Sequence, residues 1–291
     1  MKNKKTGENM LADLHIHSIH SDGTNTPGEL VAIAKANGIK TIALTDHDTV
    51  DGLDDFLKET EKNGIRGIPG VEISTSVDGV RIHVLGYMPD RRNQKLNDFF
   101  SRISMARTEN TRAILQANIR RGTITYSWEE VQRHFPSKKW LCSSHVYEAM
   151  LKDGLYKDWS QWIPFYYDYF SKKSGVYIDI DGFTSREAIE VIREAGGIAV
   201  VAHPKLIWND SKLVELLDEG IQGIEAYYPE HTEKDTDNYL SFARKHQLLI
   251  TGGTDWHGMV TMNQVTIGDC GINDSELNLL LGKFKEIDNP L

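Results

Sequence analysis

Short apolar runs alternate with amphipathic segments through the first third of the chain. Residues 11–14 and 39–44 are apolar runs typical of buried strands, and residues 27–37 between them place apolar side chains at helical spacing. Pro27 opens that segment and Gly38 follows it, as proline and glycine commonly do at the two ends of a helix. This alternation predicts a parallel β-sheet with helices outside it.

The alternation continues to residue 89, stops, and resumes at residue 175. Between these points the pattern predicts one long helix over 94–121 and an irregular, aromatic-rich helical stretch over 127–173. We therefore expect a barrel domain, residues 10–89 and 175–291, interrupted by a helical insertion, residues 90–174. The further apolar runs of the barrel are 65–68, 80–87, 196–204, 223–226 and 248–251, and its further helical segments are 53–63, 185–195, 213–219 and 234–246.

Pairs of metal-ligand residues stand at both ends of this pattern. His15 and His17 follow the first predicted strand, and Asp255 and His257 follow the last. Side chains two residues apart on a strand lie on the same face, so each pair can reach one point in space. Imidazole nitrogen combined with carboxylate oxygen suits zinc, manganese or iron. A single histidine pair could simply lie on a solvated edge, but its repetition at both ends of the chain favours a metal site.

Further ligand types stand at other strand ends. His47, Glu72 and His203 fall at or just past predicted strand ends, whereas His83 lies within its strand. In a parallel barrel the carboxyl ends of the strands form the active site. The candidates outnumber the three or four protein ligands that one ion takes, so we expect two or three metals. Glu72 is the only glutamate among them and is predicted to bridge two ions, an arrangement that suits phosphoryl hydrolysis.

The composition narrows the range of partners. Of 291 residues, 40% are apolar, which suffices for a full core, and the formal net charge is -9. An acidic chain has no general attraction to long nucleic acid or to an anionic membrane. Two cysteines give no disulfide framework, and no run is apolar and long enough to span a membrane. We therefore expect a cytoplasmic protein without a membrane partner.

Taken together, the motifs resemble those of a known family. They are His15-Ile16-His17, Asp22-Gly23, Thr45-Asp46-His47, Gly70-Val71-Glu72, Ala202-His203-Pro204 and Asp255-Trp256-His257. This set resembles the PHP (polymerase and histidinol phosphatase) superfamily and, more narrowly, its bacterial metal-dependent phosphoesterases, whose known members act on nucleotides. The resemblance covers roughly residues 10–260. It implies an α/β fold, a distorted (β/α)7 barrel, with up to three ions that are usually manganese, iron or zinc.

The resemblance also implies how the ligands are shared among the metals. The family pattern places on one metal His15, His17, Glu72 and Asp255. It places on a second metal Asp22, His47 and His257, and on a third Glu72, His83 and His203. The expected catalytic residues are Glu72, Asp255 and His257. Beside them, Asp13 and Asp46 are expected to orient neighbouring groups without binding a metal.

The insertion departs from the family pattern at one point. Where the subgroup carries an Arg-Pro-His segment, this chain reads Cys142-Ser143-Ser144-His145, so the arginine is missing. We expect the insertion to close over the metals and a phosphate contact to come from His145 or from nearby cations. The predicted substrate-binding residues are His145, Arg107, Lys139 and His231. His145 could instead only pack the insertion, and that alternative stays open.

The sequence therefore predicts a metal-dependent phosphoric ester hydrolase. The lead function is hydrolysis of a phosphate monoester on a small nucleotide-like substrate by metal-activated water. A 5′–3′ exonuclease acting on short oligonucleotides would use the same chemistry, and an amidohydrolase-type hydrolase is a further alternative. A non-catalytic scaffold would show degenerate ligand positions, and none is visibly lost here. The expected partner is a small phosphorylated substrate, either a nucleotide or a short oligonucleotide.

Overall fold

The computed structural model describes residues 12–77, 79–138, 140–207, 210–261 and 265–288. The chain divides into two compact units. The first comprises the residues up to Asp98 together with those from Phe183 onward, and the second comprises Phe99–Gly182. The predicted insertion, residues 90–174, overlaps the second unit, and its role as a cover over the metals stays a prediction. None of the described helices is long and apolar enough to cross a membrane.

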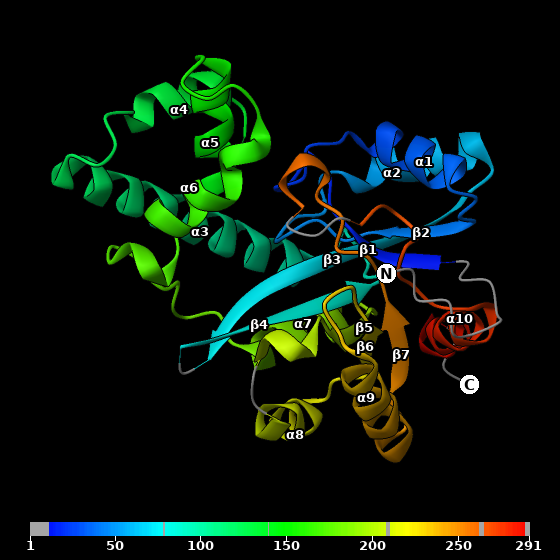
Figure 1. Cartoon of the computed structure of the whole chain (residues 1–291). Coiled ribbons are helices and arrows are strands. Elements are labelled where there is room, and N and C mark those ends of the chain that lie inside the picture. The colour runs from blue at the N-terminus through cyan, green and yellow to red at the C-terminus, as the bar shows by residue number, and fades with distance from the viewer. Residues whose placement is uncertain (1–11, 78, 139, 208–209, 262–264, 289–291) are drawn as a thin grey trace. The chain divides into compact units, whose positions relative to one another are not determined.

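The first unit is built on one seven-stranded sheet whose strands follow each other in chain order (Figure 1). An isolated parallel bridge between Ile16 and Trp256 brings the end of the first strand beside the chain that follows the last. The sheet is thereby nearly closed, and the predicted α/β barrel is confirmed. The strands are β1 (Ala12–Ile16), β2 (Thr41–Leu44), β3 (Arg66–Val77), β4 (Val80–Tyr87), β5 (Ile198–Val201), β6 (Gly223–Tyr227) and β7 (Leu249–Gly252).

Strand β4 runs against its neighbours, and this corrects the expectation of a parallel sheet. It is antiparallel to both β3 and β5, whereas the other neighbouring pairs are parallel. The tight turn between β3 and β4 is too short for the crossover that parallel strands need, and Gly79 takes a positive φ of 72° there. In this hairpin His83 pairs with Ser74, two residues after Glu72. His83 and Glu72 therefore share one face of the sheet.

Helices cover the sheet of the first unit, and clusters of buried apolar side chains join strands and helices. At the start of α1, Thr26 and Glu29 exchange hydrogen bonds in a capping box, just before the predicted helix start at Pro27. Helix α10 was not predicted from the apolar pattern, and its Leu277 and Leu280 are buried in one cluster with strand residues. The helices are α1 (Pro27–Ala36), α2 (Leu53–Asn63), α7 (Ser185–Glu194), α8 (Asp210–Glu219), α9 (Glu233–His246) and α10 (Asp274–Asp288).

The second unit is helical. It contains most of α3 (Gln94–Arg121), which has the predicted bounds, together with α4 (Trp128–His134), α5 (Ser143–Lys152) and α6 (Trp162–Tyr169). The ring of Tyr147 is buried there, with centroid distances of 5.1 Å to Phe165 and 5.8 Å to Trp162. The aromatic residues of this stretch thus form the core of the unit. Short 3-10 helices across the chain are η1 (Trp159–Gln161), η2 (Lys172–Ser174), η3 (Pro204–Ile207) and η4 (Gly258–Val260).

Candidate metal centre

The barrel brings the predicted ligands to one end of its strands. β1 carries His15 and ends one residue before His17, while β3 carries Glu72. An isolated bridge pairs His47, just beyond β2, with Glu72. The loop after β7 lies beside the end of β1 and brings in Asp255. His15, His17, His47 and Asp255 therefore meet at the ends of neighbouring strands, as expected. Glu72 corrects the expectation of a strand end, because β3 continues past it to Val77.

Glu72 lies at the centre of this cluster and is fully buried. Imidazole nitrogens surround both of its carboxylate oxygens. Those near Oε2 are His15 Nε2 at 3.0 Å, His17 Nε2 at 3.2 Å and His47 Nδ1 at 3.3 Å. Those near Oε1 are His83 Nδ1 and His203 Nε2, both at 2.9 Å. The two oxygens of one carboxylate therefore face two different sets of imidazoles.

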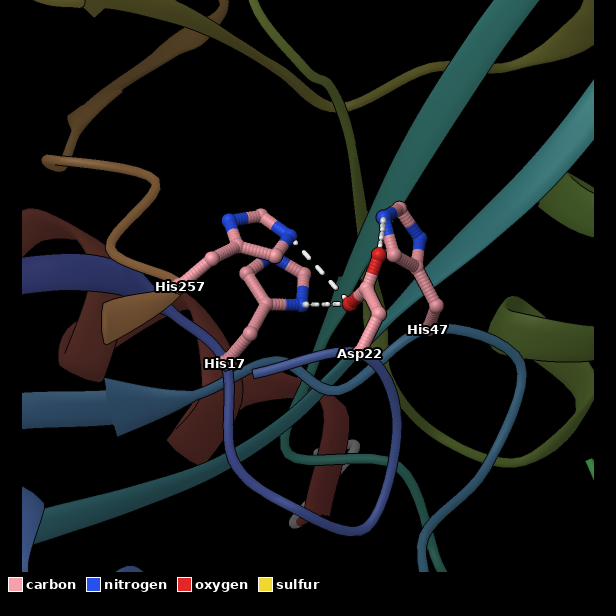
Figure 2. Close-up of side chains that lie close together, drawn as sticks. All are labelled: His17, Asp22, His47 and His257. Atoms are coloured by element: carbon pink, nitrogen blue, oxygen red, sulfur yellow. Dashed lines mark ion pairs between the residues drawn. The ribbon is translucent and has the colours of Figure 1, made fainter. Parts of the chain in front are cut away.

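Asp22 gathers a second set of imidazoles (Figure 2). Its carboxylate oxygens lie 3.2 Å from His257 Nε2, 3.9 Å from His17 Nδ1 and 4.0 Å from His47 Nε2. His257 Nδ1 lies 2.8 Å from the carbonyl oxygen of Asp255, so in the neutral ring a hydrogen on Nδ1 would leave Nε2 free to bind an ion beside Asp22. Gly23 permits the turn that carries Asp22, because a Cβ there would lie 2.5 Å from the His17 carbonyl oxygen.

Two residues of the cluster hold uncommon backbone conformations. Asp255 has a φ of 53° and His203 a φ of 26°. A positive φ is strained in residues other than glycine and persists where the surroundings impose it, often at functional sites. In this conformation Asp255 Oδ1 lies 3.1 Å from His17 Nε2 and 3.3 Å from His15 Nε2. A side chain does not fit at Gly253, where a Cβ would lie 2.4 Å from His15 N.

The buried carboxylates and imidazoles shift each other's pKa values. Burial by itself raises the pKa of Glu72, but the surrounding imidazoles, that of His47 foremost, outweigh it and hold the pKa well below its usual value. Burial lowers the pKa of His257, but the carboxylates of Asp22 and Asp255 outweigh it and raise the pKa to about 10. In the metal-free protein, therefore, imidazolium protons balance part of the carboxylate charge.

The donor atoms fit transition metals. Within the described residues, no hydrogen-bond partner is found for the buried ring nitrogens of His17 (both) and His203 (Nδ1), or for Oδ1 of Asp255. Buried polar atoms normally have one, so a bound ion is the simplest partner for them, and imidazole with carboxylate matches zinc, manganese or iron. Three overlapping groups have ligand atoms within 4.8 Å of one another: His17, Asp22, His47 and His257; His15, His17, Glu72 and Asp255; and His47, Glu72 and His83.

Two further carboxylates hold the loops around the cluster. Asp46 accepts hydrogen bonds from the amide and hydroxyl of Ser18, both at 2.7 Å, and from Ser21 Oγ at 2.6 Å. Asp13 accepts hydrogen bonds from the amide of Thr254 at 3.0 Å and from its hydroxyl at 2.6 Å. Among the described residues, neither carboxylate belongs to a group that could hold a metal. Both therefore fix the backbone that carries the ligands.

Two side chains at the site have no counterpart in the sequence analysis. Glu225 on β6 is fully buried, and its Oε1 atom lies 3.0 Å from His15 Nδ1. Tyr228, just after β6, donates a hydrogen bond from its hydroxyl to Asp255 Oδ2 at 3.3 Å. The signal that could have indicated Glu225 is a charged residue inside an otherwise apolar strand. Tyr228 has no such signal in the sequence.

The predicted substrate-binding residue His231 lies beside the cluster rather than in a ligand group. Its Nδ1 atom lies 2.9 Å from the carbonyl oxygen of Ala226. Its ring contacts those of Tyr228 and Tyr239, with centroid distances of 5.3 and 4.9 Å. Tyr228 in turn contacts the ring of His203 at 5.3 Å. A substrate contact by His231 stays a prediction.

The other predicted substrate-binding residues belong to the insertion. His145 accepts a hydrogen bond from Cys142 N at 3.1 Å at the start of α5, and its Nε2 atom lies 2.5 Å from Lys138 Nζ. The guanidinium of Arg107 lies 5.6 Å from the centre of a tryptophan ring of the same unit. Lys139 lies outside the described residues. Contacts of these side chains with substrate stay predictions.

Comparison with known proteins shows to which family this chain belongs. The family model described as PHP domain matches residues 13–182, more than half of the chain. This chain belongs to the PHP domain family. The resemblance seen in the sequence motifs is thereby confirmed, and the groups of this chain that could hold a metal include Asp22, Glu72 and Asp255.

Relatives of this PHP domain protein cover nearly all of its length. The phosphoribosyl 1,2-cyclic phosphate 1,2-diphosphodiesterase of Eggerthella lenta is 28% identical over 251 residues, which are 86% of this chain and 95% of the relative. The 3′,5′-nucleoside bisphosphate phosphatase of Chromobacterium violaceum is 29% identical over 250 residues, 84% and 86% of the two chains. A crystal structure from Bifidobacterium adolescentis, of a protein classed as a metal-dependent phosphoesterase, superposes with a TM-score of 0.84 at 26% identity, over 94% of this chain and 96% of that one.

Proposed function

We propose that this PHP domain protein is a metal-dependent phosphoesterase that hydrolyses a phosphate monoester on a small nucleotide-like substrate. The observation that carries the proposal is the position of Glu72, whose two oxygens face separate sets of imidazoles. A carboxylate in that position is suited to bridge two ions in a site for phosphoryl hydrolysis. The predicted phosphoester hydrolase also agrees with the names of its relatives, a diphosphodiesterase and a phosphatase.

The proposed cofactors are two or three divalent transition metal ions, either manganese, iron or zinc. Overlap between the donor groups supports more than one ion, because a single ion takes three or four protein ligands. When bound, such ions lower the pKa of a coordinated water and neutralise charge on the phosphoryl oxygens. The proposed ligands are His15, His17, Asp22, His47, Glu72, His83, His203, Asp255 and His257.

The exposure of the cluster indicates the side from which substrate enters. The side chains of His15 and Glu72 are 0% and 1% exposed, whereas those of Asp22, Asp255 and His257 are 21%, 19% and 15% exposed. A substrate phosphate is therefore expected to approach along the more exposed carboxylates. Asp255 and His257 lie on this more exposed side of the cluster, so we assign them, with Glu72, as catalytic residues.

The substrate class follows from charge and from the relatives. A chain with a net charge of -9 does not attract long nucleic acid. One relative is named for a nucleoside bisphosphate and another for a phosphoribosyl cyclic phosphate, so a small nucleotide-like phosphate ester is the class that we propose. We assign substrate contacts to His145, Arg107 and Lys139 of the insertion and to His231. In this proposal the helical insertion covers the active site of the barrel, residues 10–89 and 175–291.

A phosphate-release screen with manganese tests this function. It measures free phosphate with mononucleotides, nucleoside bisphosphates and sugar phosphates, and it follows cleavage of short 5′-phosphorylated oligonucleotides and of amide substrates by chromatography of the products. We expect the wild-type protein to release phosphate from a nucleotide-like monoester, and the double variant His15→Ala/Asp255→Ala to lose both metal and activity. The matched control is His246→Ala/Asp237→Ala, whose residues lie on α9 outside the donor groups.

The proposal fails if the double variant keeps the wild-type rate, or if the manganese-loaded protein releases phosphate from no monoester. Preferential cleavage of the oligonucleotides would instead favour the exonuclease alternative. Turnover of the amide substrates alone would favour the amidohydrolase alternative.

A further inference from the structure

Glu225 is a buried carboxylate that is neither a proposed metal ligand nor a proposed catalytic residue. It lies on β6 with no exposed surface. Among the described residues its ion pair is with His15, and no lysine or arginine pairs with it. An ionised carboxylate is costly to bury unless it is paired and hydrogen-bonded. Two hydrogen-bond donors, one at each carboxylate oxygen, therefore account for the burial of Glu225.

The first donor is the imidazole of His15. Glu225 Oε1 lies 3.0 Å from His15 Nδ1. Because an ionised carboxylate only accepts, Nδ1 carries the hydrogen, and in the neutral ring the Nε2 lone pair is available to bind an ion. Nε2 lies 3.0 Å from Glu72 Oε2 and 3.3 Å from Asp255 Oδ1, which belong to the same donor group. Glu225 thus fixes both the tautomer and the orientation of the His15 ring.

The second donor is the backbone amide of His203. Glu225 Oε2 accepts this hydrogen bond at 2.7 Å. The φ of His203 is 26°, a strained value that needs support from its surroundings. A hydrogen bond to an ionised carboxylate is among the stronger ones available. In this conformation the His203 ring holds Nε2 2.9 Å from Glu72 Oε1, the oxygen opposite to the one that faces His15.

We propose that Glu225 is a positioning residue that couples two ion sites, because it orients His15 on one side of Glu72 and His203 on the other. The inference rests on the metal centre of the proposed function and not on the substrate. A carboxylate behind a metal-binding histidine typically contributes about 10- to 100-fold in metal affinity or activity. Loss of Glu225 weakens ion binding on both sides of Glu72 together.

Manganese binding to the metal-free protein tests this coupling, by titration calorimetry with elemental analysis of the bound metal. Glu225→Gln keeps the shape of the side chain, but it has no negative charge to strengthen either hydrogen bond, and it offers one acceptor oxygen to two donors. The matched control is Glu276→Gln, whose carboxylate also serves two donors, the Tyr227 hydroxyl at 3.0 Å and Asn273 N at 3.2 Å. We expect Glu225→Gln to need about 10- to 100-fold more free manganese for each ion, and Glu276→Gln to bind as the wild type does.

Wild-type manganese affinity in folded Glu225→Gln overturns the proposal, and a lower Tm with unchanged binding shows a merely structural role. If the affinity for only one of the ions falls, the proposed coupling between the two sites is wrong. If circular dichroism shows that Glu225→Gln is unfolded, Glu225→Asp replaces it. This variant keeps the charge but withdraws both oxygens by one methylene, so it should also bind manganese more weakly, and wild-type binding overturns the proposal. A protein that passes these tests but hydrolyses no phosphate ester contradicts the proposed function alone.

Discussion

Binding of manganese to the metal-free protein is expected to release protons. Burial lowers the pKa of His257, but Asp22 and Asp255 outweigh it and raise the pKa to about 10, so the ring is protonated at pH 7. A metal ion binds the neutral imidazole, and the proton has to leave. Burial likewise lowers the pKa of His15, but Glu72 and its neighbouring carboxylates raise it well above its usual value. His15 therefore adds a second proton.

The pH dependence of affinity follows from these protons. Each proton released makes the apparent association constant rise about tenfold per pH unit while the pH stays below the pKa of the group. The proton of His257 alone predicts about 100-fold tighter manganese binding at pH 8.5 than at pH 6.5, which corresponds to about 2.7 kcal/mol. A second proton, from His15, makes the dependence steeper while the pH stays below its raised pKa.

Titration calorimetry in two buffers of different ionisation enthalpy counts the protons. Wild-type protein at pH 7 is expected to release at least about one proton per molecule filled with manganese. His257→Gln should release about one proton fewer, whereas His246→Gln, on α9, should match the wild type. Release of less than about half a proton, together with an affinity that is flat from pH 6.5 to 8.5, would refute the reasoning.

The same shift sets a pH window for the stability of the metal-free protein. The pKa of His257 is about 10 in the folded state against 6.5 for the ordinary group. Because the folded value is the higher one, its contribution to stability is fully present below pH 6.5 and is lost as the pH rises to about 10. A shift of about 3.5 pH units corresponds to roughly 5 kcal/mol. Urea unfolding of chelator-treated protein should show a falling free energy of unfolding across this window, and a rise would contradict the assignment.

The remaining predictions concern single side chains. Glu72→Gln should lower the phosphate-release rate more than about 100-fold, because the ions lose their shared ligand. Asp46→Asn should mainly lower the Tm, because it disturbs hydrogen bonds to two serines; equal activity losses in the two variants would count against bridging by Glu72. His145→Ala should lower stability by roughly 1 kcal/mol through loss of the bond from Cys142 N. With the predicted substrate contact it should also lower kcat/KM about tenfold; an unchanged kcat/KM in the folded fraction would leave His145 as a packing residue.

The sequence allowed the predicted ligands to be found because they depend on local rules. His15 and His17 needed only the two-residue period of a strand, and their approach to Asp255 needed only the rule that neighbouring strands end together. The reversal of β4 was not predicted. The apolar run 65–68 is followed by Pro69 and Gly70, which are typical of turns. The sequence pattern therefore does not indicate that β3 continues to Val77. A hairpin, rather than a crossover, then places His83 beside Glu72.

Residues that act through tertiary contacts gave no comparable signal. Glu225 is a single charged residue in a short strand, and its two partners lie on β1 and just after β5, far from it in the sequence. His231 shows how far the local rule reaches, and its predicted substrate contact stays a prediction. It follows a strand end, as the ligands do, but its ring turns back to the carbonyl of Ala226. Position at a strand end therefore selects candidates, and only the side-chain direction separates a ligand from its neighbours.

The electrostatics of the cluster decide how ligand variants have to be interpreted. Opposing imidazoles hold the pKa values of Asp22, Glu72 and Asp255 well below their usual range although burial alone would raise them. When one carboxylate is removed, the facing imidazolium does not remain as an unpaired buried charge, because burial favours the neutral ring and the proton leaves. The variant then loses the stabilisation that this pairing gave the metal-free fold, a loss of a few kcal/mol. A ligand variant is therefore expected to lower the Tm of the metal-free protein and also to lose the rise in Tm that manganese produces in the wild type, so the Tm with and without manganese separates a metal ligand from a residue that only stabilises the barrel.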